Sequence, residues 1–237
     1  VKLGNYPILF HIINHFYLFG HREFVICLGY KQEVIKDYFM KIKFLDNDLF
    51  IKKGITEIIQ PLKNNLFPEA EFKLINTGLR SNTGQRLLNV KSFINQNQPF
   101  FLTYGDGISS IDLDKLFLFH KSHKGFATVT SVHPSARFGE IIAQRDGLVN
   151  YFKEKPAVQK SWINGGYFIF EREIFDYIDN SKNEMLEQAP LERIVNQNQL
   201  YTYQFEGYWR CMDTQRDLKS IKDELELGKY PYSIENG

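Results

Sequence analysis

The chain has 237 residues, enough for one large domain or two small ones, and hydrophobic residues make up 43% of it. Its 29 Lys and Arg residues nearly balance 28 Asp and Glu residues, which argues against a nucleic-acid-binding protein that works through bulk charge. No apolar run approaches the roughly 18 residues that a membrane-spanning helix needs, and no signal-peptide pattern is visible. We therefore expect a cytoplasmic protein without a membrane partner.

The start of the chain alternates between helix and strand patterns. Pro7 opens a stretch with apolar residues at helical spacing, and residues 24–28 form a short apolar run that Gly29 ends. Residues 31–39 again have the spacing of a helix. A buried strand between helices is typical of an α/β domain with a parallel sheet.

The rest of the chain continues this alternation less regularly. We expect strands at residues 71–76, 99–104, 127–132, 148–154, 166–170 and 201–205, and helices at residues 85–93, 112–123, 188–197 and 213–226. No internal repeat and no Gly/Ser linker interrupts them. The sequence therefore predicts a single domain over residues 1–237, with a small β-rich lobe between residues 127 and 170.

The cysteines and histidines form no recognisable metal-site pattern. Cys27 lies inside an apolar run and is expected to be a buried small hydrophobic residue. His11 and His15 share one face of a predicted helix but lack the glutamate of the zinc-protease motif. His120 and His123 flank a predicted helix end and are expected at the surface.

A single acid stands just after the strand predicted at residues 99–104. Asp106 lies between Gly105 and Gly107 in the stretch FFLTYGDG. In open α/β sheets, ligands bind beyond the carboxyl ends of the strands, where a carboxylate can hold a divalent cation and glycines let a nucleotide approach the backbone. A simple turn is the alternative, because Gly-Asp-Gly is favourable turn chemistry.

The stretch SNTGQR, residues 81–86, supplies two hydroxyls, an amide, a glycine and an arginine just before a predicted helix. Helix N-termini and arginine both favour phosphate groups. An ordinary helix cap is the alternative, with Ser81 or Thr83 accepting a hydrogen bond from the next helix.

Two further polar stretches accompany strands. In FKEKP, Glu154 and Lys155 come at the end of a predicted strand with side chains on opposite faces, so that lysine can meet a phosphate and glutamate a sugar hydroxyl. A solvated charge run is the alternative. In WINGGYFIF, Asn164 precedes a strand and suits either recognition of a polar ligand or a hairpin turn.

Asp213 follows an aromatic pair in GYWRCMDT, directly before a predicted helix. It is a candidate helix N-cap and also a candidate second metal ligand. The two roles do not exclude each other.

Each of these stretches alone is weak evidence for a function, but their order along the chain is specific. SNTGQR, YGDG, RFGE (residues 137–140), FKEKP, NGG and MDT follow one another along the chain. In that order they resemble the sugar-phosphate nucleotidyltransferases, in particular the glucose-1-phosphate cytidylyltransferases. The resemblance extends over essentially the whole chain, from PILFHII through GYKQEVIKDYF to WRCMDTQRDL.

The resemblance implies a Rossmann-like α/β fold, with a mixed, mainly parallel sheet flanked by helices and a sugar-binding role for the β-rich lobe. It implies transfer of a cytidylyl group from CTP to α-D-glucose 1-phosphate, giving CDP-glucose for polysaccharide biosynthesis and pyrophosphate, with Mg²⁺ as cofactor. The attacking phosphate oxygen is already ionised at neutral pH, so positioning and charge neutralisation replace a strong general base. The resemblance also suggests a homo-oligomer.

The motif match assigns roles to individual residues. Asp106 and Asp213 would hold the metal, and together with Lys155 they would be the catalytic residues. The nucleotide side would be formed by Ser81, Thr83, Gly84, Arg86, Gly105 and Asp106. The sugar-phosphate side would be formed by Glu154, Lys155, Asn164, Gly165, Glu187 and Trp209.

The sequence departs from the family at its start and near Asp213. The family begins with a strand and a glycine-rich loop that carries an arginine and is followed by a lysine, and we expect these in a longer chain, before Val1. A polypeptide that truly began at Val1 would have little or no turnover. Arg210 and Cys211 also differ from the residues expected before MDT, which leaves the sugar specificity open.

Two alternative functions follow from the same residues. The first is a transferase of the same fold that uses another nucleoside triphosphate or another sugar phosphate. The second is a non-catalytic protein that binds a nucleotide sugar.

Overall fold

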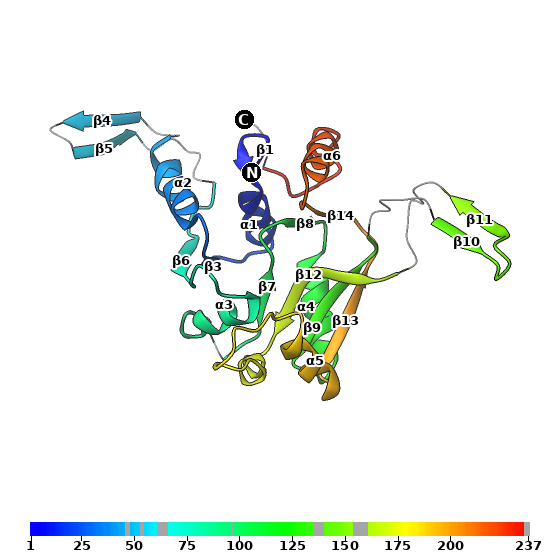
Figure 1. Ribbon diagram of the computed structural model, residues 1–237. Helices are drawn as coiled ribbons and strands as arrows, with labels where there is room; N and C mark the ends of the chain where they lie inside the picture. Colours follow the sequence, from blue (N-terminus) through cyan, green and yellow to red (C-terminus); the bar gives the residue numbers. More distant parts are fainter. Residues whose placement is uncertain are drawn as a thin grey trace.

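A computed structural model describes residues 1–45, 48–52, 55–60, 66–95, 97–134, 140–153 and 161–234. Its centre is a four-stranded mixed sheet with the order β13-β9-β12-β7 (Figure 1). β13 (Leu200–Phe205) runs parallel to β9 (Ala127–Val132). β12 (Ile163–Phe170) is antiparallel to both β9 and β7 (Phe100–Thr103). The α/β class with a mixed sheet is therefore confirmed.

A second, two-stranded sheet lies beside the first. β3 (Glu23–Leu28) pairs in parallel with β6 (Glu71–Asn76), and α2 (Gln32–Leu45) follows β3. Phe24 and Phe72 are partners in this register, and their rings stack with centroids 5.3 Å apart. The parallel pairing is the one that the apolar run at residues 24–28 predicts.

Helices cover both faces of the four-stranded sheet, and β12 shows why. Tyr167 and Ile169 enter one buried cluster, whereas Phe168 and Phe170 enter another, because successive side chains of a strand point to opposite faces. The first cluster includes residues of α1 (Ile8–Leu18), α4 (Leu113–Ser122) and α6 (Gln215–Glu226). The second includes residues of α3 (Thr83–Asn89) and α5 (Ala189–Asn196).

The remaining elements are short. They are β1 (Lys2–Leu3), β2 (Tyr6–Pro7), β4 (Asp48–Lys52), β5 (Ile55–Gln60), β8 (Gly107–Ser109), β10 (Glu140–Ala143), β11 (Val149–Lys153), β14 (Trp209–Cys211) and two 3₁₀ helices at Lys91–Phe93 and Arg172–Tyr177. Every helix within the described ranges is too short or too polar to cross a bilayer.

The helix starts follow local capping chemistry. Pro7 directly precedes α1 with φ −60°, and Asp112 caps α4 by accepting a hydrogen bond of 3.0 Å from the N–H of Lys115. At α6 the cap is Thr214, which forms a capping box with Asp217. The cap role predicted for Asp213 therefore belongs to its neighbour, and the Asp213 carboxylate stands outside the helix.

The β-rich lobe is smaller than residues 127–170. β9 and the second half of β12 are buried and belong to the central sheet, because their side chains fill its two cores. Among the described residues of this range, only the hairpin of β10 and β11 stands apart, and Figure 1 shows it projecting from the body on the side opposite the β4–β5 hairpin.

Two predictions about single residues are wrong. Cys27 is exposed on β3, whereas a buried position was predicted from its apolar neighbours. His120 is buried and bonds through Nδ1 to the hydroxyl of Thr128, 2.8 Å away, so it is not a surface residue. His11 and His15 are buried core residues whose Nε2 atoms bond to the backbone carbonyl oxygens of Leu3 and Ile111.

Candidate functional site

Asp106 and Asp213 lie close together because a short strand pair joins their segments. β8 and β14 are antiparallel, with Trp209 opposite Ser109 and Cys211 opposite Gly107. The pairing continues one step further, since the N–H of Met212 donates a 3.0 Å hydrogen bond to the carbonyl oxygen of Asp106. The backbone therefore positions both acids at the end of β7, where ligands of α/β sheets bind.

A thiol completes this group. Asp106, Cys211 and Asp213 each offer one potential ligand atom, and the three atoms all lie within 4.8 Å of one another. The Cys211 Sγ lies 3.5 Å from Oδ1 of Asp213 and donates to it. We call these residues the acid–thiol cluster. Its three donors have the types that divalent cations bind.

The electrostatics of the acid–thiol cluster disfavour additional negative charge. The pKa of Asp106 is raised, first because the carboxyl is partly removed from water and then because the Asp213 carboxylate lies nearby. The pKa of Cys211 is raised to about 12 by burial and then by Asp106 and Asp213. A divalent cation would relieve this repulsion. The acid–thiol cluster is therefore suited to bind a cation.

The alternation of side chains along β14 separates its residues into two roles. Trp209 donates from Nε1 to the carbonyl oxygen of Gly165, 2.8 Å away. Arg210 points to the other side, where its Nη2 lies 2.9 Å from a carboxylate oxygen of Glu224 in α6. Cys211 returns to the face of Trp209. Arg210 is therefore bound to the C-terminal helix, and the predicted sugar-side residues Trp209 and Gly165 are in contact.

Glu187 links two of the predicted stretches. It accepts a 2.6 Å hydrogen bond from the hydroxyl of Thr83 and a short one from the hydroxyl of Tyr104. The pKa of Tyr104 is raised above its usual range by burial and by this bond. Because Tyr104 directly follows β7 and Thr83 begins α3, SNTGQR and YGDG share one edge of the fold.

The other residues of SNTGQR bond within the protein. Ser81 donates to the carbonyl oxygen of Thr77, 2.5 Å away, and Arg86 donates from Nη1 to the Thr77 hydroxyl at 2.7 Å. Gly84 is packed so closely that a Cβ there would lie 2.9 Å from the carbonyl oxygen of Glu184. These contacts shape the loop and leave its nucleotide role as a prediction.

The glycines near Asp106 differ in what requires them. Gly166 has φ +76°, and a Cβ there would lie 2.7 Å from the ring of Tyr104. Its N–H donates a 2.8 Å hydrogen bond to Oδ1 of Asn164, so the side-chain amide of Asn164 forms part of this turn. At Gly105, by contrast, no described atom beyond its two chain neighbours lies within 4 Å of the Cβ position. Packing does not require that glycine, whereas a ligand approaching the backbone would.

Two of the predicted stretches are described incompletely. Glu154 and Lys155 lie outside the described residues, as do residues 137–139 of RFGE. Their predicted contacts with the sugar and its phosphate stay predictions.

Two members of this region were not predicted as site residues. Tyr104 lies inside the quoted motif YGDG. The alternation of side chains along a strand would have placed it on the face opposite to that of Thr103. Cys211 was recognised only as a departure from the family pattern. Its position opposite Gly107 depends on the pairing of two three-residue strands, which no sequence periodicity reveals.

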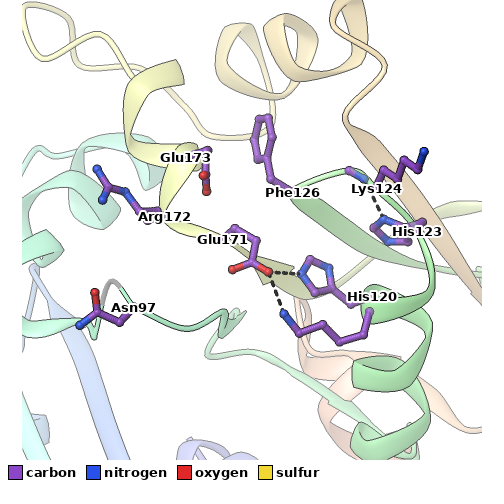
Figure 2. A pocket seen from close by; sticks show the side chains of 10 residues that line it. Asn97, His120, His123, Lys124, Phe126, Glu171, Arg172 and Glu173 are labelled. Atoms are coloured by element: carbon purple, nitrogen blue, oxygen red, sulfur yellow. Dashed lines mark hydrogen bonds and ion pairs between the residues drawn. The ribbon is translucent and has the colours of Figure 1, made fainter.

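A hollow of about 520 Å³ lies at the opposite end of the sheet (Figure 2). It adjoins Phe126, just before β9, whereas Asp106 follows the far end of β7. Glu171 binds Lys121 at 3.1 Å and His120 at 3.5 Å there, as the dashed lines show. None of the predicted site residues lines it, so we do not place the nucleotide site in this hollow.

The fold is that of known sugar nucleotidyltransferases. A putative glucose-1-phosphate thymidylyltransferase from Bacillus anthracis matches with a TM-score of 0.65, covering 100% of this chain and 87% of that chain at 17% identity. A UDP-glucose pyrophosphorylase matches with a TM-score of 0.66, covering 96% of this chain and 89% of that chain at 15% identity. At these identities the likeness shows the fold alone.

The sequence comparisons go further. Glucose-1-phosphate cytidylyltransferase from Salmonella typhi is 35% identical over 98% of this chain and 89% of its own length. A probable glucose-1-phosphate cytidylyltransferase from Bacillus subtilis is 32% identical over the same shares. Residues 1–226 match the family described as nucleotidyl transferase. The chain therefore belongs to the nucleotidyl transferase family, as the order of its motifs predicts.

Proposed function

We propose that the protein is a glucose-1-phosphate cytidylyltransferase, which converts CTP and α-D-glucose 1-phosphate into CDP-glucose and pyrophosphate. The observation that carries the proposal is the 35% identity to such an enzyme over 98% of the chain. The paired carboxylates of Asp106 and Asp213 support it, because they stand at the end of β7 where a nucleotide would bind.

Asp106 and Asp213 are the metal ligands in this proposal. Mg²⁺ is usually held by one or two carboxylates together with substrate phosphates and waters, and two carboxylates at this sheet end fit that demand. A bound Mg²⁺ would neutralise charge on the triphosphate. The raised pKa of Asp106 fits the same role, because a cation removes the repulsion that Asp213 exerts on it.

The chain itself has to orient two polyanions. The sugar phosphate attacks the α-phosphorus of CTP in line, and its oxygen needs no base to remove a proton. The open space at Gly105 permits the nucleotide to lie against the backbone beside Asp106. The nucleotide side is completed by Ser81, Thr83, Gly84 and Arg86.

The sugar phosphate occupies the other side of Asp106 in this proposal. Trp209 and Gly165 are in contact there, and Glu187 reaches the same edge through Tyr104. Asn164, Glu154 and Lys155 complete this side, with Lys155 on the phosphate.

Pyrophosphate release tests the proposal directly. The full chain, including any residues that its gene encodes before Val1, is incubated with Mg²⁺, glucose 1-phosphate and each of CTP, UTP, dTTP and GTP in turn. We expect CTP to support the fastest release. Equal rates with UTP or dTTP would reject the cytidylyl assignment, and CDP-glucose binding without any release would favour a binding protein.

Our proposals for the assembly and the location of the protein rest on the family resemblance alone. We propose a cytoplasmic homo-oligomer that binds no nucleic acid. Light scattering on the purified protein measures the number of subunits, and a monomeric mass would reject the homo-oligomer.

A further inference from the structure

The thiol of Cys211 is the feature of this site that its proposed chemistry does not use. It is held in place by backbone contacts on both sides of it. Cys211 itself pairs with Gly107 in the β8–β14 register, and the next residue, Met212, bonds to the carbonyl oxygen of Asp106. The backbone around Cys211 is therefore bonded to the backbone around Asp106. The direction of β14 then points the thiol toward the two carboxylates.

The same strand shows that this direction is specific. Arg210 is turned to Glu224 in α6, and Trp209 is bound to Gly165 on the opposite side. Because side chains alternate along a strand, Cys211 has to share the side of Trp209. Its contact with Oδ1 of Asp213 at 3.5 Å is consistent with that.

We propose that Cys211 is a third donor in the metal site of Asp106 and Asp213, and that it gives the site high affinity for a thiophilic divalent cation such as Zn²⁺ or Cd²⁺. The inference rests on the proposed metal role of the two carboxylates. Mg²⁺ takes oxygen ligands, whereas zinc is bound readily by a mixture of thiolate sulfur and carboxylate oxygen. On binding, the thiol releases its proton to solvent and the sulfur binds the cation.

The distances fit such a cation. A tetrahedral zinc with a Zn–S bond of about 2.3 Å and a Zn–O bond of about 2.1 Å separates the two ligand atoms by about 3.6 Å. Sγ of Cys211 and Oδ1 of Asp213 are 3.5 Å apart, and all three potential ligand atoms lie within 4.8 Å of one another.

The consequence is competition between cations at one site. A thiophilic cation would occupy the two carboxylates and displace Mg²⁺, so trace zinc or cadmium would block the site that the nucleotide needs. A protein with only the two carboxylates would bind such a cation far more weakly.

Cadmium is the probe for a direct binding test, because a cadmium–thiolate pair has a charge-transfer band in the ultraviolet that a difference spectrum against the metal-free protein isolates. The full chain is titrated with CdCl₂ without nucleotide or sugar. We expect one equivalent to produce the charge-transfer band, and Cys211→Ser to abolish it and weaken cadmium binding at least tenfold by calorimetry. Cys27→Ser is the matched control and should leave the band unchanged.

A second measurement needs no variant. The unmodified protein is treated with iodoacetamide with and without CdCl₂, and both cysteines are quantified by peptide mass spectrometry. We expect cadmium to slow alkylation of Cys211 at least tenfold, while Cys27, which is exposed and far from the acids in sequence, serves as the internal reference. Equal alkylation of Cys211 in both samples would overturn the inference.

Neither readout depends on turnover. If the protein failed to transfer cytidylyl groups but cadmium still bound through Cys211, the proposed function would fall and the thiol ligand would stand. If transfer were confirmed and the cadmium band persisted in Cys211→Ser, the thiol ligand would fall alone.

Discussion

The N–H of Met212 donates a 3.0 Å hydrogen bond to the carbonyl oxygen of Asp106. Through this bond, two acids from distant parts of the chain are held by one backbone frame, which β8 and β14 extend. The bonds of this frame are made by backbone atoms and not by the two carboxylates. Substitutions at Asp106 and Asp213 should therefore change charge and ligation without dismantling the local structure.

Replacing Asp106 tests the metal role. We expect Asp106→Asn to reduce pyrophosphate release about 100-fold or more, because an amide is a poor ligand for Mg²⁺ and the charge of the triphosphate is then left uncompensated. Steady-state release with CTP measures the effect. Asp114→Asn, an exposed acid in the first turn of α4, is the control and should retain activity. Near-normal turnover of Asp106→Asn would contradict the assignment.

The same substitution should stabilise the metal-free protein. The pKa of Asp106 is raised on folding, so its ionised form favours the unfolded chain, and the stability it contributes is lost as pH rises through the folded-state pKa. With EDTA present, Asp106→Asn should therefore unfold at higher urea concentration than the parent near neutral pH. The difference should shrink as the pH is lowered, and a difference that grew instead would show the sign to be wrong.

Two glycines give a paired prediction. Gly166→Ala should cost about 1–2 kcal/mol for its positive φ alone, and more for the contact with the ring of Tyr104. Gly105→Ala should leave urea unfolding unchanged, because its Cβ enters open space. We expect it to raise the KM for CTP, since the new methyl occupies the approach of the nucleotide. An unchanged KM would place the nucleotide elsewhere.

His15 should make the protein acid-sensitive. Burial lowers its pKa from 6.5 to about 4, so its contribution to stability is present above the unfolded-state pKa and is lost as pH falls. Its Nε2 donates to the carbonyl oxygen of Ile111, and within the described structure no group lies in position to accept a hydrogen bond from Nδ1 once the imidazole takes up a second proton. Between pH 7 and 5, His15 should cost about 2 kcal/mol of stability.

The control for this effect is His15→Gln, whose amide can still donate to the Ile111 carbonyl oxygen but does not titrate. Urea unfolding of both proteins at the two pH values isolates the histidine. A variant as acid-sensitive as the parent would assign the effect to other groups.

The Tyr104–Glu187 bond should matter for both folding and activity. Tyr104→Phe leaves a partly buried carboxylate without its phenol donor, at a cost of about 1–3 kcal/mol. Turnover should fall as well, because the bond connects the end of β7 with the start of α3. Tyr151→Phe, on the exposed strand β11, is the matched control and should change neither quantity.

Sequence patterns predicted the long elements well and the short ones poorly. The apolar runs of β3 and β9 and the helical spacing of α1 identify these elements because each has several residues of one period. β8 and β14 have three residues each, too few for any period. Their pairing nevertheless brings Asp106 and Asp213 together, so the motif order predicted the pair of acids and local pattern alone did not.

Errors at single residues have equally local causes. Thr214 and Asp213 are adjacent and both are good caps, and only the capping box with Asp217 decides between them. Cys27 lies in an apolar run, yet a strand at the edge of a two-stranded sheet leaves it exposed. His120 was expected at the surface, because a hydrogen bond to the buried Thr128 cannot be seen in the sequence.

The ion pair of Arg210 and Glu224 ties the C-terminal helix to the residue directly before Cys211. The hydroxyl of Tyr208, the residue directly before β14, donates to the same glutamate at 2.9 Å, so Glu224 of α6 binds one side chain just before β14 and one within it. Displacing α6 would pull on β14 and shift the thiol and Asp213 against Asp106. Breaking this ion pair should therefore weaken cation binding by the acid–thiol cluster, although α6 carries none of its ligands.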